Sequence, residues 1–190
     1  MKVTIRVGVF DWTEFPSDKG FYPPDLPAEW RFGFFSNEFE AACIDLSRVD
    51  VEADEFLAWV DDMPDSFKLC FLANQVSELE LLRTLDTQSD VQIDSVLTGS
   101  DNDVFLQQLS FSRLPCFKIG SIWSPEHVAM SSGMAWMPAR QTTRDYRNWV
   151  DQWLESYSGS DEELILWLPG TETTYAELTN IKTLVELMGY

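Results

Sequence analysis

Apolar residues along the chain form two patterns: short continuous runs, and longer segments in which apolar side chains recur every three or four residues. Short runs bounded by polar turns are typical of strands covered on both faces, and the longer period is typical of helices with one buried face. The runs predict strands at residues 3–10, 41–45, 67–72, 91–97, 116–119, 135–137 and 164–168. The periodic segments predict helices at residues 28–35, 51–63, 78–85, 103–111, 143–157 and 178–188.

Proline and glycine mark several boundaries of these elements. Pro27 suits the first turn of a helix, where its missing N–H costs no hydrogen bond, and Pro64 stops the second helix. Gly8, inside the first strand, indicates that another backbone or a ligand approaches closely there. The first helix is expected to bury an apolar stripe made of Trp30, Phe34 and Phe35.

The alternation of strands and helices predicts βα units, and therefore a largely parallel sheet with helices outside it. Six strands, or seven when the short run at residues 135–137 is counted, are too few for an eight-stranded barrel of roughly 250 residues. The expected fold is thus α/β, an incomplete or reduced TIM-barrel-like structure or an open sheet. No internal repeat or low-complexity linker divides the sequence, so residues 1–190 are expected to form a single domain.

The net negative charge of the sequence limits the kinds of macromolecule that the protein is expected to bind. The sequence has 13 Lys and Arg against 32 Asp and Glu, a net charge of -19, which repels nucleic acids and anionic membranes. A disordered acidic chain would be poor in aromatic residues, whereas this one has 13 Phe, 8 Trp and 5 Tyr, as expected of a packed core.

The cysteines and the hydropathy of the sequence indicate in which cellular compartment the protein is expected. Cys43, Cys70 and Cys116 are widely spaced and odd in number, which favours reduced core thiols over disulfides, and no Cys-x-x-Cys pair suggests a zinc site. The N-terminus lacks the pattern of a signal peptide, and no apolar stretch is long enough to cross a bilayer. We therefore expect a cytoplasmic protein.

Two ends of the sequence carry a family resemblance. Gly8, Trp12, Phe21-Tyr22-Pro23 and Leu26-Pro27-Ala28-Glu29-Trp30 stand in the order found at the start of the YecE-like family, and this region resembles that family of TIM-barrel-like domains of unknown function. Near the other end, Ala176, Asn180 and Leu184 are similar to its Ala-x-x-x-Asn-x-x-x-Leu order.

The sequence also departs from the family pattern. After the second strand the family has an Asn-x-x-Phe-Tyr segment, where this sequence reads Asp45-Leu46-Ser47-Arg48, and paired asparagines after the last strand are replaced by Pro169-Gly170. Members are usually longer. The resemblance therefore implies a shortened, divergent relative whose ancestral site is altered.

Ligands of parallel α/β folds lie beyond the carboxyl ends of the strands. Asp11 and Asp45 follow strands there and are candidate catalytic residues, as an acid and base pair or as ligands of Mg²⁺. His127, the only histidine, is a candidate general base. The alternative, which we favour, is that the two acids are solvated loop residues and that His127 belongs to an ordinary turn. Candidate ligand-binding residues on the same rim are Trp12, Asn74 and Gln75.

The sequence holds no Gly-x-Gly-x-x-Gly, P-loop or Gly-x-Ser-x-Gly motif, so it indicates no cofactor and assigns no metal ligands. Trp149, Trp153 and Tyr157 form one helical stripe, which serves either the core or an interface; a homodimer would bury any uncovered edge of a truncated barrel. The leading hypothesis is a binding or assembly protein without an intact catalytic set. The alternative is a small-molecule enzyme with an acidic strand-end site around Asp11, Asp45 and His127, using either acid–base or divalent-metal-assisted chemistry.

Overall fold

The computed structural model describes residues 3–15, 20–49, 53–60, 63–87, 93–109, 114–126, 133–160 and 162–190. Within these ranges the strands are β1 (Thr4–Phe10), β2 (Ala41–Asp45), β3 (Lys68–Leu72), β4 (Ile93–Thr98), β5 (Cys116–Lys118), β6 (Met134–Trp136) and β7 (Glu163–Pro169). The helices are α1 (Arg31–Glu38), α2 (Ala53–Val60), α3 (Glu78–Thr87), α4 (Asp103–Leu109), α5 (Thr143–Ser156) and α6 (Tyr175–Met188). Short 3-10 turns lie at Trp12–Glu14, Ala28–Trp30, Leu46–Arg48 and Ile119–Ser121.

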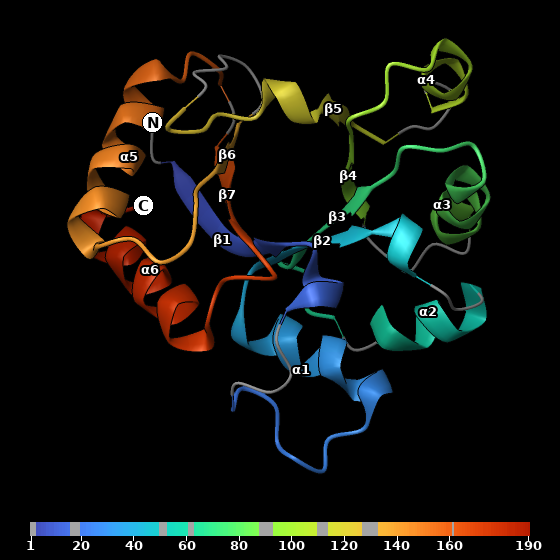
Figure 1. The fold of residues 1–190 in the computed structure, drawn as a ribbon, viewed down its shortest axis with the longest axis horizontal. Helices are drawn as coiled ribbons and strands as arrows, with labels where there is room; N and C mark the ends of the chain where they lie inside the picture. The colour runs from blue at the N-terminus through green and yellow to red at the C-terminus, as the bar shows by residue number, and fades with distance from the viewer. Residues whose placement is uncertain are drawn as a thin grey trace.

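The strands form one sheet in the order β5-β4-β3-β2-β1-β7-β6, and every neighbouring pair is parallel. The sheet is curled, and the helices are arranged around its outer side (Figure 1). In the part of the chain that the structure describes, no pairing joins the end strands β5 and β6 to each other. The predicted α/β, reduced TIM-barrel-like fold is confirmed, in the form of an open half-barrel.

The two faces of the sheet have separate apolar clusters. Alternate residues of β1, namely Ile5, Val7 and Val9, are buried with the helices on the outer face. The inner face is filled by a second cluster, which includes Phe10 at its margin. Its buried members are Ala41, Cys43, Cys70, Leu72, Leu97, Ile122, Met134, Ile165 and Trp167.

Gly8 lies on the inner face, directly opposite Ala41 of β2. A Cβ atom on residue 8 would overlap the carbonyl oxygen and the side chain of Ala41. The close approach predicted from this glycine is therefore that of a neighbouring strand, not of a ligand.

The aromatic stripe of α1 differs from the prediction. Phe32 and Phe35 are fully buried, whereas Trp30 is 65% exposed. Trp30 belongs to the 3-10 turn that precedes the helix, and a three-residue period turns its side chain away from the face that α1 buries.

Helix α5 begins with a capping box. The Thr142 hydroxyl accepts from the backbone N–H of Asp145, and the Asp145 carboxylate accepts from the backbone N–H of Thr142. Trp153 is buried, while Trp149 and Tyr157 are half-buried and pack against the same outer cluster. The predicted stripe thus packs against the core.

Cys43 and Cys70 are buried, stand opposite each other on β2 and β3, and form no disulfide. Cys116 is also a free thiol but is exposed, so the expectation of core thiols is correct for only two of the three. None of the helices within the described ranges has the length and apolar character needed to cross a membrane.

Candidate functional site

Asp11 and Asp45, predicted to share a rim, lie at the carboxyl ends of β1 and β2 and are joined there by Arg48. Arg48 Nη1 lies 3.3 Å from Asp11 Oδ2 and 2.5 Å from Glu14 Oε1, and its Nε lies 3.4 Å from Asp45 Oδ2. We call these four residues the rim cluster. Three carboxylates share a single guanidinium, so the cluster keeps a net negative charge.

Local turns fix both aspartates of the rim cluster. Asp11 ends β1 in a left-handed conformation, with φ of 62°, and its Oδ1 accepts from the Thr13 hydroxyl at 2.6 Å. Asp45 Oδ1 accepts from both the backbone N–H and the hydroxyl of Ser47, at 3.0 and 2.7 Å. The Asp45 contact with the Ser47 backbone is an Asx turn, whereas Asp11 is held by a side-chain hydrogen bond, and each carboxylate thus has an intramolecular donor.

The electrostatics of the rim cluster differ from one residue to another. Burial raises the pKa of Asp11, although the Thr13 hydrogen bond and the Arg48 charge oppose the rise. The same carboxylate is the main cause of a raised pKa at Arg48, which therefore stays cationic. The Arg48 guanidinium lies between the two aspartates and contacts both. Within the described ranges, no group of three or more His, Cys, Asp or Glu side chains is arranged to hold a metal ion.

Of the candidate ligand-binding residues on the rim, Trp12 and Asn74 make contacts within the fold. Trp12 is buried, with its ring 5.0 Å from that of Phe32 and perpendicular to it. Asn74 Oδ1 accepts from the backbone N–H of Gly99 at 2.8 Å and so ties the end of β3 to the end of β4. Gln75 has an exposed side chain. A ligand-binding role for these residues stays a prediction, and His127 lies outside the described residues.

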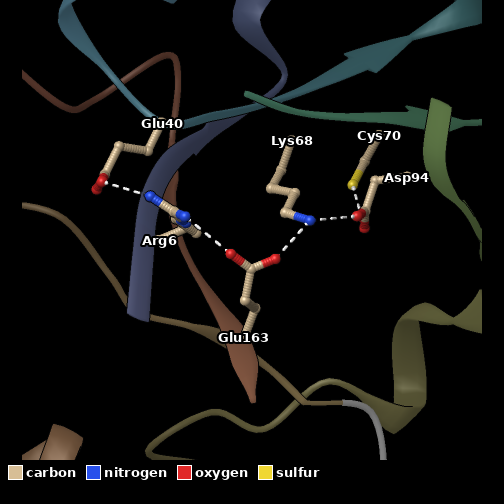
Figure 2. A network of polar contacts seen from close by, with 6 residues as sticks. All are labelled: Arg6, Glu40, Lys68, Cys70, Asp94 and Glu163. Atoms are coloured by element: carbon tan, nitrogen blue, oxygen red, sulfur yellow. Dashed lines mark hydrogen bonds and ion pairs between the residues drawn. The ribbon is translucent and has the colours of Figure 1, made fainter. Parts of the chain in front are cut away.

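Sequence reasoning missed a second polar group, at the amino ends of the strands (Figure 2). Arg6 of β1 bonds Glu40 at 3.1 Å and Glu163 of β7 at 2.8 Å. Lys68 of β3 bonds the same Glu163 at 2.7 Å and Asp94 of β4 at 3.2 Å. We call this chain of ion pairs the amino-end network.

The amino-end network holds its charges in the ionised state. Hydrogen bonds from Lys68 and Arg6 lower the pKa of Glu163. Burial by itself lowers the pKa of Lys68, but its bonds with Glu163 and Asp94 outweigh burial and raise that pKa. A permanently charged lysine is a poor nucleophile or base, so the geometry favours a structural role.

Glu163 and Lys68 belong to β7 and β3, which are separated in the sheet by β1 and β2. Their contact therefore spans β1 and β2 across the inner face of the half-barrel. A cavity of about 440 Å³ lies beside it, lined in part by Phe117 and Met134. One feature of the sequence could have predicted the amino-end network: Arg6 is a single charged residue inside an otherwise apolar strand.

Between its two polar ends the half-barrel is packed. Trp167, Cys43 and Cys70 are fully buried on the inner face. Burial strongly raises the pKa of both thiols, so neither is an activated nucleophile. The rim cluster and the amino-end network are therefore separate sites.

Comparison with known proteins gives one match. No family model matches the sequence, and no curated protein matches it. Among solved structures, the fold is similar to that of a DUF72 family protein from Thermotoga maritima, with a TM-score of 0.48 and 8% sequence identity over 96% of this chain and 99% of that one.

Proposed function

We propose that this protein is a divergent relative of the YecE-like family that acts by binding or assembly and not by catalysis. The observation that carries the proposal is the position of Arg48, whose guanidinium contacts Asp11, Glu14 and Asp45 together. An internal cation at the rim takes the place of a metal or a positively charged substrate group. Free, buried Cys43 and Cys70 support a reducing compartment, the cytoplasm.

Divalent-metal titrations followed by thermal unfolding test this proposal. We expect Mg²⁺ and Mn²⁺ to leave the melting temperature of the wild type unchanged, because the Arg48 guanidinium already contacts all three carboxylates. Arg48→Met should gain metal-dependent stabilisation, which Asp11→Asn with Asp45→Asn should remove. Arg83→Met, at an exposed arginine of α3, is the matched control and should resemble the wild type.

The second candidate function is a small-molecule enzyme that uses the rim cluster. The raised pKa of Asp11 favours it, because a half-buried carboxyl with an elevated pKa suits proton transfer. This alternative replaces the first proposal if Mg²⁺ or a metabolite stabilises the wild type and the Asp11→Asn, Asp45→Asn double variant loses that stabilisation.

We further propose that a second copy of the chain covers the open end of the sheet at β5. Cys116 and Lys118 of this strand are exposed, and Ile119 beside it is 38% exposed. Unpaired strand edges tend to be covered by another chain or element.

Light scattering tests the proposed dimer and should give twice the 21.9 kDa chain mass. Ile119→Glu should yield monomers, and Val104→Glu, at an exposed position of α4, should not. A monomeric wild type would contradict assembly.

A further inference from the structure

A cavity of about 310 Å³ lies between the beginnings of α5 and α6. The segment after β6 supplies Arg140 and Gln141 to its wall, and Thr174, the N-cap of α6, follows β7. The cavity therefore lies on the side of the carboxyl ends of β6 and β7, where α/β folds place their ligands. Its volume is at the lower end of the roughly 300–1,000 Å³ usual for small-molecule sites.

Two opposite charges line this cavity, Arg140 and Glu177. Glu177 Oε1 accepts a hydrogen bond from the backbone N–H of Arg140 and lies 2.8 Å from the hydroxyl of Tyr146. Burial, and after it the Glu177 carboxylate, raises the pKa of Tyr146, so this side chain remains a neutral hydroxyl. Both contacts use Oε1, so Oε2 has no hydrogen-bond partner among the residues that the structure describes.

The Arg140 side chain is equally available. Over the described ranges, no carboxylate lies within ion-pair distance of its guanidinium. Its backbone is left-handed, with φ of 61°, a conformation that is uncommon for arginine and that the hydrogen bond to Glu177 helps to hold. The Arg140 backbone is thus held against the Glu177 carboxylate, and both residues line the same cavity.

One face of α6 supplies the apolar part of the wall. Ala176 and Leu184 lie eight residues apart on this face, and Ile181 is buried next to them. Asn180, between them, adds an amide that can donate and accept. Ala176, Asn180 and Leu184 are the three residues of the family-like order near the end of the sequence, and all three line this cavity.

We propose that this cavity binds a free aliphatic amino acid, with its carboxylate on Arg140, its ammonium on Glu177 and its side chain against Ile181 and Leu184. Because the cavity is lined by one positive and one negative side chain, it disfavours ligands that carry only a negative or only a positive charge. An anion would meet Glu177 in a chain of net charge -19, and a plain cation would meet Arg140. The inference rests on the proposed function, because it names a ligand for a protein that binds without catalysis.

Calorimetry and thermal shift with the natural amino acids test the proposal on the intact chain, with L-leucine as the main probe. We expect leucine to bind, and N-acetyl-leucine and leucinamide, which each lack one charge, to bind about tenfold or more weakly. Arg140→Gln and Glu177→Gln should weaken leucine binding to a similar degree. The matched controls, Arg144→Gln and Glu172→Gln, change exposed residues that do not line the cavity and should bind as the wild type does.

Pairing the variants with the blocked ligands gives a stricter test. Glu177→Gln should not weaken the binding of N-acetyl-leucine further, and Arg140→Gln should not weaken that of leucinamide further, because each ligand already lacks the partner group. The proposal is overturned if no amino acid stabilises the wild type, or if the control variants lose as much affinity as the cavity variants. Either result leaves the metal titrations at the rim cluster, and so the non-catalytic function, unaffected.

Discussion

Gly170 lies so close to Asp11 that a Cβ atom at position 170 would overlap the carbonyl oxygen of Asp11. The backbone N–H of Gly170 also donates to the carbonyl of Phe10 at 2.7 Å. The end of β7 and the end of β1 are therefore locked together beside the rim cluster, and only glycine fits between them.

Gly170→Ala should lower the free energy of unfolding by about 2–3 kcal/mol, because the added methyl group meets backbone atoms and not a flexible side chain. Urea denaturation measures the loss. Gly120→Ala is the control, since a Cβ there meets nothing within 4 Å and the change should be nearly neutral. Equal stability of the two variants would contradict the close approach.

Glu163→Gln should destabilise the protein by about 1–2 kcal/mol at neutral pH, because Arg6 and Lys68 lose a shared carboxylate that is itself partly solvated. The pKa of Glu163 is lower in the folded protein than its ordinary value of 4.5. The stabilisation is therefore complete above pH 4.5 and disappears as the pH falls through the folded pKa.

Denaturant curves of the wild type and Glu163→Gln, measured from pH 7 down to pH 3, should converge at the acid end. Glu162→Gln removes the charge of an exposed neighbour that takes no part in the ion pairs of the amino-end network. Its effect should stay within about 0.5 kcal/mol at every pH. If the difference in unfolding free energy between the wild type and Glu163→Gln stayed constant from pH 7 to pH 3, protonation of Glu163 would not weaken the amino-end network.

In the Ile119→Glu variant, where no second copy should cover β5, iodoacetamide should label only Cys116 of the folded protein. This thiol is exposed, whereas Cys43 and Cys70 are fully buried; burial raises the pKa of all three thiols, so access to the reagent decides which one reacts. Mass spectrometry should find one adduct natively and three in denaturant, and Cys116→Ser should remove the native adduct. Rapid native labelling of Cys43 or Cys70 would mean that the inner face opens to solvent.

Trp153→Ala should cost about 3–5 kcal/mol, since this buried ring fills the contact between α5 and the core. Trp30→Ala is the matched aromatic truncation at a 65% exposed position and should change stability by less than about 0.5 kcal/mol. Thermal or urea unfolding of both variants checks the assignment. A comparable loss in Trp30→Ala would place that ring in the core after all.

The sequence predicted the candidate site only in part. It placed Asp11 and Asp45 on one rim, because parallel strands deliver their carboxyl ends to the same edge. It did not place Arg48 between them, since the direction of a long side chain after a turn depends on the neighbouring strand. The amino-end network was missed for a related reason: Arg6 and Glu163 are 157 residues apart, and only the pairing of β1 with β7 brings them together.

The sequence by itself determined the order of strands and helices, because the spacing of apolar residues dictates which segments have one buried face and which have two. It also determined the parallel sheet, since helices alternate with most of the strands and return the chain to the same end. Only the tertiary structure decided which aromatic residues are buried, as the exposed Trp30 and the buried Phe32 illustrate. It alone decided that the sheet remains open and that Arg48 contacts the three rim carboxylates, because both depend on contacts that the local sequence pattern does not predict.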